Sequence, residues 1–595
     1  MQILRWVSKV FLICFAVSVF SVSVEAEEGS QSQAPICFEA DRVSLLGFKS
    51  KILKDTTEIL ASWVGRDCCG GDWEGVVCNP ATGRVTGLAL QRPDKENQMY
   101  MIGTLSASLG NLHFLEVLVI SGMKHISGPI PESLTNLNRL TQLILEDNSL
   151  EGSIPPGLGH LSLLKTLSLN GNRLRGQIPP TLGNLRNLLV ITLARNFLSG
   201  PIPPTFKNFT TLQSFDLSFN LLSGFIPDTL GKSQNLTYID LSNNHLSGTF
   251  PISICSLANL QDLSLSHNQL TGTIPDQIGS LKSLTSLQLS DNKFIGHIPA
   301  SISRLHNLWN LNLSRNGFSD TLPVIPSLLS VDLSYNNLSL GTVPDWIKNK
   351  QLSNVNLAGC KLGGNLPKFT KPDSLSSIDL SNNLFTDGIS SFFTNLSTLQ
   401  SIKLSNNQLK FDLSEVQLPD GITFIDLHSN QITGSLSSII NNRTSNFLEA
   451  LDVSGNHISG GIPEFPEGLS LKVLNIGSNK ITGHIPSSIS NLVELEMLDI
   501  QRNLITGTIP TTLGLLSKLQ WLDVCVNSIT GKIPTSLLGI KGLKHANFRA
   551  NRLCGEIPQG RPYNIFPGSA YAHNLCLCGK PLPPCRGKNQ AKMGQ

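Results

Sequence analysis

Apolar and polar residues recur along the chain in one pattern, which is clearest at residues 212–227 as LQSFDLSFNLLSGFIP. In its first half, LxxLxLxxN, the apolar residues of LxL alternate with polar ones, as expected of a short strand with one buried face. Phe215 and Leu217 hold these two positions here, and the residues around them are expected to face solvent. The second half, LxGxIP, contains a Gly that permits a tight bend and a Pro that cannot donate to a sheet.

An Asn ends the first half of nearly every unit and measures its period. It recurs every 24 residues at Asn148, Asn172, Asn196, Asn220, Asn244, Asn268, Asn292 and Asn316. After a shorter step the same slot is held by Asn336, Cys360, Asn383, Asn407, Asn430, Asn456, Asn479, Asn503, Asn527 and Asn551. A fixed period of this size predicts a leucine-rich repeat solenoid, here of about 20 coils, in which neighbouring coils bury each other's apolar faces.

The chain therefore divides into an array and its two ends. The predicted segments are a signal peptide (1–26), an N-terminal cysteine cap (37–82), the repeats (83–553, irregular at 320–344 and 385–462), a C-terminal cysteine cap (554–585) and a polar tail (586–595). Fifty Gly and 33 Pro are explained mostly by the repeated LxGxIP element and do not indicate disorder.

The first 26 residues have the features of a secretory signal. Arg5 and Lys9 precede an apolar run, and small residues stand before a cleavage position near Ala26. The alternative, a transmembrane anchor, is disfavoured because the run is short for a bilayer. The tail carries neither a hydrophobic anchor signal nor a retention signal, so we expect a soluble, secreted protein without direct membrane insertion.

Cysteines gather at both ends of the array, where terminal coils lack an outer neighbour. Each group of four allows three pairings. We expect the disulfides Cys37–Cys68, Cys69–Cys78, Cys554–Cys576 and Cys578–Cys585. The adjacent pair Cys68 and Cys69 lacks the spacing of a zinc site, and no metal is expected. Of the remaining cysteines, Cys255 is expected to be buried, Cys360 to occupy the Asn slot, and Cys525 to be partly exposed.

The N-terminal cap is expected to begin with a helix over Asp41 to Leu53 that buries Val43, Leu46, Phe48 and Leu53. Trp63 and Trp73 are expected to cover the first coil. The polar segment QRPDKENQMYM at 91–101 interrupts the first repeat, and we interpret it as a solvated insertion rather than a partner contact.

Glycosylation is predicted by N-x-S/T sequons at Asn208, Asn235, Asn312, Asn337, Asn395 and Asn442. Asn312 lies within a strand motif, so a glycan there would obstruct the outward face of its coil.

Three features together resemble one family. These are the LxGxIP element, the N-terminal pattern of Cys37, Trp63, Cys68-Cys69, Trp73 and Cys78, and the C-terminal segments NRLCGEIPQG and LCGKPLPPC. The chain resembles plant extracellular leucine-rich repeat proteins: ectodomains of receptor-like proteins and receptor kinases, and polygalacturonase-inhibiting proteins. The resemblance implies an α/β right-handed superhelix with a concave parallel β-sheet, and ligand recognition by variable residues on that face or its flank.

No catalytic grouping is predicted, and the chain is expected not to be an enzyme and to need no cofactor. The Asp residues of the LDLS motifs occupy one slot of successive coils, which predicts a structural or solvated row rather than a catalytic pair. With 15% charged residues and a net charge of +3, the composition does not suggest a nucleic-acid partner.

Aromatic and basic residues at outward positions are the candidate ligand contacts, because such side chains serve as interface anchors. A first group lies on neighbouring coils: Phe219, Tyr238, His267, Trp309, Arg315 and Tyr335. A second group follows at Phe424, His428, Arg502, Trp521, His545 and Arg549.

The function expected from these features is stoichiometric binding of an extracellular protein or peptide in defence or signalling. A receptor kinase co-receptor is the expected membrane partner. The alternative is a soluble inhibitor of a cell-wall-degrading enzyme, such as a microbial polygalacturonase or glycoside hydrolase.

Overall fold

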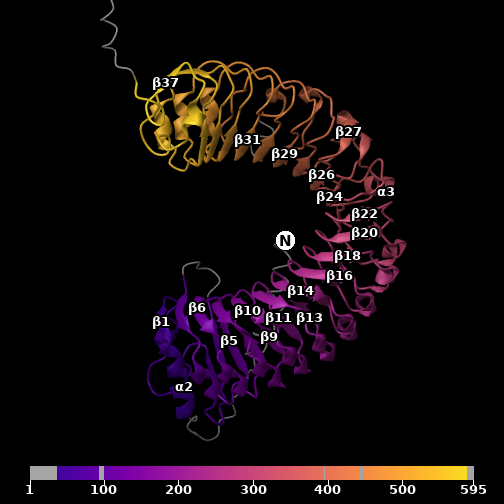
Figure 1. The fold of residues 1–595 in the computed structure, drawn as a ribbon, viewed down its shortest axis with the longest axis vertical. Coiled ribbons are helices and arrows are strands. Elements are labelled where there is room, and N and C mark those ends of the chain that lie inside the picture. Colours follow the sequence, from indigo (N-terminus) through magenta and orange to yellow (C-terminus); the bar gives the residue numbers. More distant parts are fainter. Residues whose placement is uncertain (1–35, 93–98, 394, 442–446, 586–595) are drawn as a thin grey trace, which may run out of the picture.

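The structure is a computed structural model that describes residues 36–92, 99–393, 395–441 and 447–585. The predicted signal peptide, the polar tail, Asn442 and the centre of the polar insertion at 93–98 lie outside these ranges. The described chain winds into an arc whose two capped ends face the same open side (Figure 1).

The inner, concave face of the arc is one long sheet with one strand from nearly every coil (Figure 1). β2 pairs antiparallel with β3, and the later strands pair parallel in chain order. The strands are β2 (Val76–Cys78), β3 (Val85–Gln91), β5 (Val117–Ser121), β7 (Gln142–Ile144), β9 (Thr166–Ser168), β11 (Val190–Thr192), β13 (Ser214–Asp216), β15 (Tyr238–Asp240), β17 (Asp262–Ser264), β19 (Ser286–Gln288), β21 (Asn310–Asn312), β23 (Ser330–Asp332), β24 (Asn354–Asn356), β26 (Ser377–Asp379), β28 (Ser401–Lys403), β29 (Phe424–Asp426), β30 (Ala450–Asp452), β31 (Val473–Asn475), β32 (Met497–Asp499), β33 (Trp521–Asp523) and β35 (His545–Asn547).

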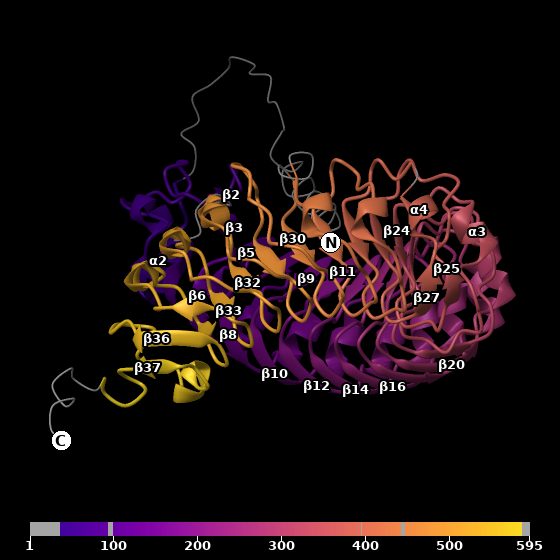
Figure 2. The same cartoon turned by 90° about the horizontal axis from the view of Figure 1, so that it is seen from above.

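A second sheet, called the flank sheet below, covers one side of the N-terminal half (Figure 2). Apart from β1, which belongs to the N-terminal cap and pairs antiparallel, its strands come from the LxGxI part of each coil, whose Gly adopts a left-handed backbone, as at Gly224 with φ of +79°. They are β1 (Ile52–Asp55), β4 (Met101–Thr104), β6 (Lys124–Pro129), β8 (Ser149–Gly152), β10 (Arg173–Gln177), β12 (Phe197–Gly200), β14 (Leu221–Phe225), β16 (His245–Thr249), β18 (Gln269–Gly272), β20 (Lys293–His297) and β22 (Gly317–Ser319).

The flank sheet ends at Ser319, where the sequence pattern first becomes irregular. Beyond it, one pair, β25 (Gly363–Asn365) with β27 (Leu384–Asp387), and the terminal series β34 (Thr530–Gly531), β36 (Arg552–Glu556) and β37 (Cys576–Cys578) remain. Elsewhere in the described C-terminal half the flank is reduced to isolated bridges, such as Gly461 with Thr482. The short helices α3 (Asp345–Lys348) and α4 (Ile389–Phe392) come after the end of the flank sheet in the chain.

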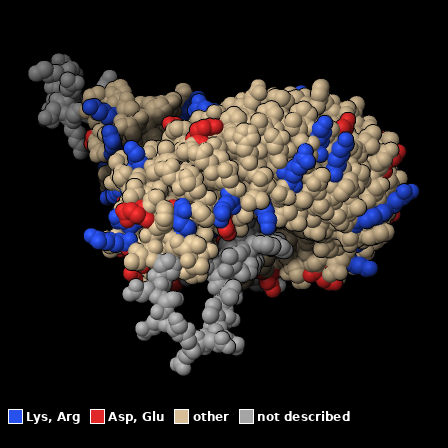
Figure 3. Space-filling model, turned by 90° about the horizontal axis from the view of Figure 1, so that it is seen from below, with Lys and Arg blue, Asp and Glu red and all other residues tan. Residues whose placement is uncertain are grey.

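Short 3₁₀ turns close most coils behind the strands, and those of successive coils pack on one another. They are η1 (Ile59–Ser62), η2 (Ala107–Asn111), η3 (Glu132–Asn136), η4 (Pro156–His160), η5 (Pro180–Asn184), η6 (Pro204–Asn208), η7 (Asp228–Lys232), η8 (Ile252–Ser256), η9 (Asp276–Ser280), η10 (Ala300–Arg304), η11 (Leu413–Glu415), η12 (Leu436–Ser438), η13 (Ser487–Asn491), η14 (Thr511–Leu515), η15 (Thr535–Gly539) and η16 (Gly568–Tyr571). Seen from outside, the N-terminal half shows Lys and Arg side chains scattered among uncharged residues (Figure 3). In the part of the chain that the structure describes, no helix is long and apolar enough to span a membrane.

The core runs continuously between the coils and confirms the predicted burial pattern. Phe215 and Leu217 are completely buried, as are their counterparts Ile239 and Leu241. The repeated Asn forms a buried ladder: the Asn244 amide donates to the Leu217 carbonyl of the previous coil at 3.0 Å and accepts from the Leu222 N–H at 3.0 Å. Cys360 fills this slot with its Sγ 3.3 Å from the Leu333 carbonyl. Because the ladder pairs backbone groups that the turn leaves free, it joins each coil to the one before.

Both ends of the solenoid carry the four predicted disulfides, Cys37–Cys68, Cys69–Cys78, Cys554–Cys576 and Cys578–Cys585. Trp63 and Trp73 stack with ring centroids 5.4 Å apart and are almost fully buried, so they close the first coil as expected. Cys255 is buried as predicted. Cys525 is buried too, because its side chain packs against Gln501 of the preceding coil. The prediction of a partly exposed thiol was therefore wrong.

The helix of the N-terminal cap differs from its prediction. α2 (Glu39–Lys49) ends four residues before Leu53, and the chain then enters β1, which pairs with β4. Leu45 and Phe48 point into the core, whereas Val43 and Leu53 are exposed. The predicted apolar face therefore mixed helical residues with one strand residue, and the pairing with β4 decides where the helix stops.

Candidate ligand-binding surface

Each coil presents five outward slots, which we number from the coil Leu212–Asn220. Slot 1 is Gln213, slot 2 Ser214, slot 3 Asp216, slot 4 Ser218 and slot 5 Phe219. Because the strands are parallel and in register, residues in the same slot lie beside each other, as Ser214 beside Tyr238 and Asp216 beside Asp240. The concave face is thus a set of five rows that run across the strands.

Slot 3 is the row of Asp residues, and its carboxylates hold the turn that follows each strand. The Asp216 carboxylate accepts from the Ser218 N–H at 2.9 Å and its hydroxyl at 2.7 Å, and Asp332, Asp379 and Asp452 do the same. Burial, followed by the neighbouring Asp240 charge, raises the pKa of Asp216 to about 6. These contacts are structural, which agrees with the role expected of the Asp row.

Slot 5 holds the residue directly before the ladder Asn, and its backbone is left-handed in almost every coil. Small or amide residues fit this conformation at little cost, as Gly359 and Asn382 do. Bulkier residues adopt it at Phe219, His267, Arg315, Tyr335, Arg502 and Val526. A non-glycine residue with positive φ costs about 1 kcal/mol, so large side chains in slot 5 are not there for the turn itself.

Slot 5 residues of the middle coils make one connected row, which we call the edge row. Asp291 lies 3.6 Å from His267 Nδ1 and 3.8 Å from Arg315 Nε. The Arg315 guanidinium stands 4.6 Å from the centre of the Tyr335 ring. The Tyr335 hydroxyl in turn accepts from the Asn382 amide at 3.1 Å.

Tyr335 reaches Asn382 across an intervening coil because that coil has Gly359 in slot 5. A Cβ at residue 359 would lie 2.7 Å from the Tyr335 ring, which is closer than side chains tolerate. The ring thus lies over the glycine, yet 40% of Tyr335 stays exposed. The edge row is therefore a solvent-facing surface of aromatic and cationic side chains that are ordered by contacts with one another.

The other predicted residues of the first group stand apart from the edge row. Phe219 is contacted by the Arg195 guanidinium at 5.3 Å. Tyr238 is in slot 2, half-buried, with its hydroxyl 3.4 Å from Asp240; burial, then the nearby carboxylates, raises its pKa. Trp309 is in slot 1, at the opposite end of the strand from Arg315, and is 40% exposed. The six residues therefore lie on neighbouring coils, as expected, but do not form a single contiguous patch.

The second group divides in the same way. Phe424, Trp521 and His545 share slot 2, where the Trp521 and His545 rings stack 3.6 Å apart. His428 and Arg549 hold slot 4, and Arg502 holds slot 5. His545 Nε2 also lies 3.6 Å from the Asp523 carboxylate.

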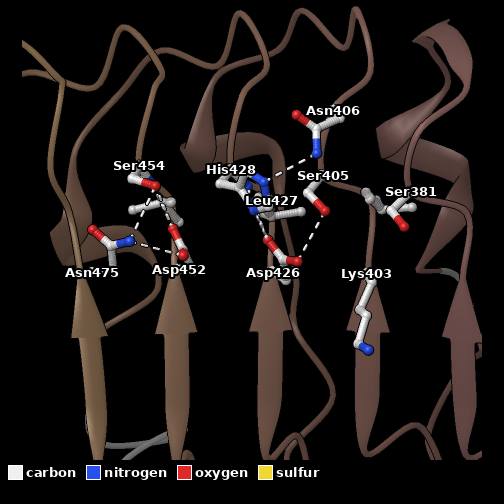
Figure 4. Close-up of polar contacts among 12 residues, drawn as sticks. Ser381, Lys403, Ser405, Asn406, Asp426, Leu427, His428, Asp452, Ser454 and Asn475 are labelled. Atoms are coloured by element: carbon white, nitrogen blue, oxygen red, sulfur yellow. Dashed lines mark hydrogen bonds and ion pairs between the residues drawn. The ribbon is translucent and has the colours of Figure 1, made fainter. Parts of the chain in front are cut away.

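His428 replaces the usual Ser of slot 4 and connects its own coil to the preceding one (Figure 4). Its Nδ1 is 2.6 Å from Asp426 Oδ1, and its Nε2 is 3.1 Å from the Asn406 amide. This bond to Asp426 raises the pKa of His428, against the effect of burial. Burial alone would raise the pKa of Asp426, but the His428 contact lowers it overall. Asp452 lies close enough to complete a three-residue group of metal-ligand type, but its carboxylate is already bonded to Ser454 and Asn475.

Sequence reasoning sought aromatic and basic residues and so missed the partners that organise them. Asp291 and Asn382 connect the edge row, and both could have been found by reading slot 5 coil by coil. Val473 and Met497 are outward apolar residues in slot 2, between Phe424 and Trp521. Aliphatic residues at a solvent-facing slot were the available signal.

Sequons lie on different parts of the coil. Asn312 is in slot 3 of β21, and its side-chain oxygen accepts from Ser314. Asn208 ends η6, and Asn235, Asn337 and Asn395 are exposed. Three residues separate Asn312 from Trp309 on the same concave face, so a glycan there would lie beside that tryptophan.

Sequence comparison finds the Leucine rich repeat family at residues 186–246, 210–270, 258–318 and 447–505, with shorter matches at 139–161, 163–185 and 374–396. The Leucine rich repeat N-terminal domain matches residues 38–79. Among related proteins, the leucine-rich repeat protein FLOR 1 of Arabidopsis thaliana is 36% identical over 115 residues, 19% of this chain and 32% of that protein. A polygalacturonase inhibitor of Vitis vinifera is 32% identical over 139 residues, 23% of this chain and 38% of that protein. The matched part is thus about a third of the length of these relatives.

Plant receptor ectodomains are among the solved structures with a similar fold. The ectodomain of the Arabidopsis thaliana receptor kinase GASSHO1/SCHENGEN3, in complex with CASPARIAN STRIP INTEGRITY FACTOR 2, has a TM-score of 0.60 at 31% identity, over 81% of this chain and 61% of that one. The Arabidopsis receptor kinase HAESA, in complex with the peptide hormone IDA and the co-receptor SERK1, has a TM-score of 0.58 at 27% identity, over 92% of this chain and 100% of that one. The repeats, the cap and these neighbours agree, and the chain belongs to the plant extracellular leucine-rich repeat proteins.

Proposed function

We propose that the protein is a secreted recognition protein that binds an extracellular protein or peptide on its concave face, in defence or signalling. It acts by stoichiometric binding, together with a membrane partner such as a receptor kinase. The observation that carries this proposal is the edge row, where Arg315, Tyr335 and Asn382 are held against one another while Tyr335 remains exposed. Ordered aromatic and cationic side chains lose little freedom on binding and therefore suit an interface.

The structural neighbours support the same proposal. HAESA is described in complex with a peptide hormone and a co-receptor, and its fold matches this chain over nearly its whole length. By analogy, a peptide ligand and a second receptor are the partners we propose for this chain.

Affinity capture from plant extracellular fluid tests the proposal. The wild-type protein is expected to retain a protein or peptide that the Tyr335→Ala and Trp309→Ala variants retain at least tenfold less. Phe225→Ala is the matched control, because Phe225 is an exposed aromatic on the flank strand β14. If the wild type captures nothing with and without elicitor treatment, the recognition proposal fails.

Glycan occupancy at Asn312 decides which part of the concave face is available. Mass spectrometry of the secreted protein is expected to show Asn312 largely unmodified if Trp309 contacts the ligand. A fully glycosylated Asn312 would exclude a binding site around Trp309 and leave the C-terminal coils or the flank.

A second candidate function is inhibition of a cell-wall-degrading enzyme, favoured by the similarity to a polygalacturonase inhibitor. It predicts loss of activity when the protein is mixed at near-equal molar ratio with one member of a panel of polygalacturonases and glycoside hydrolases. Full activity of every enzyme in that panel would count against it.

A further inference from the structure

Slot 2 of the C-terminal coils forms an apolar stripe on the solvent side of the concave sheet. Strand register places its members directly beside one another on β29 to β33. We define the apolar stripe as Phe424, Ala450, Val473, Met497 and Trp521. Trp521 is 38% exposed and the others are partly exposed, so this is surface rather than core.

The same slot is polar in most of the preceding coils. From β13 to β28 it holds Ser214, Tyr238, Asp262, Ser286, Asn310, Ser330, Asn354, Ser377 and Ser401. Folding does not require apolar residues here, because those strands pair in the same register with polar ones. A run of adjacent outward apolar side chains, confined to one part of an otherwise polar row, marks an interaction site.

An acidic row lies beside the stripe, two residues further along each strand. Slot 3 holds Asp426, Asp452, Asn475, Asp499 and Asp523. Over these strands the carboxylates Asp426, Glu449, Asp452, Glu496, Asp499 and Asp523 outnumber the basic residues His428, Lys472 and Arg502. Asp499 and Asp523 are each only 5% exposed, so the accessible negative charge lies on the other four carboxylates. Lys472 is paired with Glu449 at 2.8 Å and His428 with Asp426 at 2.6 Å, so Asp452 and Glu496 are the accessible carboxylates that these two pairs leave for a ligand.

Each end of the stripe already contacts a basic side chain. The Lys403 ammonium lies 5.6 Å from the centre of the Phe424 ring and 3.7 Å from Asp379. Figure 4 shows Lys403 on β28, next to the strand that bears Asp426. At the other end, His545 stacks on Trp521 and lies near Asp523. Lys403 therefore shows what one end of the surface accepts, which is a cation placed between an aromatic ring and a carboxylate.

We propose that strands β29 to β33 bind an extended peptide segment whose apolar side chains seat on the stripe and whose Lys or Arg side chains face the acidic row. This inference rests on the proposed recognition function and specifies the chemistry of its ligand. The segment crosses the strands. With neighbouring strands about 4.8 Å apart and an extended chain rising about 3.3 Å per residue, the stripe matches about six residues. In an extended peptide, successive side chains point to opposite sides, so alternation of apolar and basic residues places each kind on its own row.

Electrostatics of the acidic row supports a cationic ligand. Burial raises the pKa of Asp499, against the hydrogen bonds that it accepts from Gln501, and the carboxylates of Asp523 and Asp452 raise it further. The folded protein therefore holds these charges at a cost that a nearby ammonium or guanidinium group would relieve. Binding is expected to weaken as salt rises, because part of the attraction acts through solvent.

Synthetic peptides test the proposal directly. Fluorescence anisotropy compares a labelled octapeptide of alternating Leu and Lys with a Leu–Glu and a Ser–Lys octapeptide on the full-length secreted protein. The Leu–Lys peptide is expected to bind at least tenfold more tightly than either. Equal affinity for Leu–Lys and Leu–Glu would overturn the proposal.

Two variants locate the site. Trp521→Ala is expected to weaken Leu–Lys binding at least tenfold, and Asp499→Asn at least threefold with a smaller salt dependence. Asn at this position keeps an oxygen that can accept from the Gln501 N–H, and urea unfolding of Asp499→Asn checks that its effect on affinity does not arise from unfolding. Leu515→Ala, an exposed apolar residue on η14 of the same coil, is the control and should leave affinity unchanged. Undiminished binding by Trp521→Ala would refute the site.

Capture from extracellular fluid separates this inference from the function on which it rests. A ligand that is retained by the wild type, lost by Tyr335→Ala and still retained by Trp521→Ala would uphold recognition and overturn the present inference. Absence of any captured ligand would instead remove the recognition proposal. Loss of the ligand in Trp521→Ala would support both.

Discussion

The coils from β13 to β21 and those from β29 to β33 share one concave sheet but differ in nearly everything attached to it. In the first region the flank carries paired strands, such as β14 and β16 joined over Ser223 to Phe225. In the second, the flank is reduced to bridges such as Thr508 with Thr530. Slot 2 is polar in the first region and mainly apolar in the second. Backbone pairing and the Asn ladder are thus the part that folding demands, whereas the flank and the outward slots vary freely.

The largest expected effect tests the part that the two regions share. Asn244→Ala and Asn503→Ala should each lower the free energy of unfolding by about 3 kcal/mol, since each truncation leaves buried backbone groups unpaired. Both amides donate to three carbonyls and accept one N–H, from Leu222 and Ile481 respectively. Urea unfolding measures the change.

Asn187→Ala is the control for the ladder, because this exposed Asn makes a single hydrogen bond to the Ser162 carbonyl. Its cost should be below about 1 kcal/mol. A much smaller cost at Asn503 than at Asn244 would mean that the ladder depends on the flank sheet, and the comparison would need to be redrawn.

Gly359→Ala tests the edge row at the boundary between the two regions. We expect a loss of about 2 kcal/mol of stability, partly from the left-handed backbone and partly because the new methyl group displaces the Tyr335 ring. Gly455→Ala is matched, since Gly455 has the same φ of +63° and its Cβ would meet only Ser429 atoms at 3.3 Å or more. Thermal unfolding that shows equal losses for the two variants would mean that the ring contact contributes nothing.

Hydrogen exchange measures the flank directly. Flank amides of β14 to β20 should exchange at least tenfold more slowly than the corresponding amides of Thr482, Thr506 and Thr530, each of which donates across a flank that lacks a continuous sheet. Mass spectrometry of peptic fragments gives both rates in one experiment. Similar protection in the two regions would show that the flank sheet adds no local stability.

Asp240→Asn has the smallest expected effect and compares the Asp rows. In the C-terminal half, Asn475 and Asn547 each follow a pair of Asp residues in slot 3 and donate to Asp452 at 2.9 Å and Asp523 at 3.0 Å. Asp216 and Asp240 are also adjacent carboxylates, but Ser264 follows them in place of an Asn. The substitution should therefore raise the free energy of unfolding at pH 7 by about 1 kcal/mol.

The pH dependence follows from the raised pKa of Asp216. Between about pH 4, where an unfolded Asp titrates, and about pH 6, the folded protein holds more protons than the unfolded chain. Stability therefore falls as pH rises through this window, and Asp240→Asn should flatten the fall. Exposed Asp373→Asn is the control and should leave the profile unchanged. A variant profile that matches the wild type would place the cause elsewhere.

Much of the fold could be predicted from the sequence because the repeat states each buried position many times. Phe215, Leu217 and the ladder Asn are read from a template, and the end caps follow from the clustering of cysteines. The helix boundary at Lys49 could not be read this way, since it depends on the pairing of β1 with a strand some fifty residues away. Burial of Cys525 likewise depends on Gln501 in the preceding coil.

The candidate site was predictable by residue type but not by arrangement. Trp309 and Tyr335 were identified as outward residues. That they lie at opposite ends of their strands follows only from counting slots across coils. Contact between Tyr335 and Asn382 depends on the missing side chain at Gly359, which no single repeat reveals. Val473 and Met497 were passed over because an apolar residue in one coil is unremarkable until its neighbours in the same row are apolar too.

Because the flank sheet ends at Ser319, the two halves of the arc should resist bending to different extents. The N-terminal half has hydrogen-bonded strands on two sides and should be the stiffer half. Elastic deformation is therefore expected to concentrate beyond Ser319. A ligand that spans β29 to β33 would stiffen the more flexible half. Its binding would therefore alter the opening between the two capped ends.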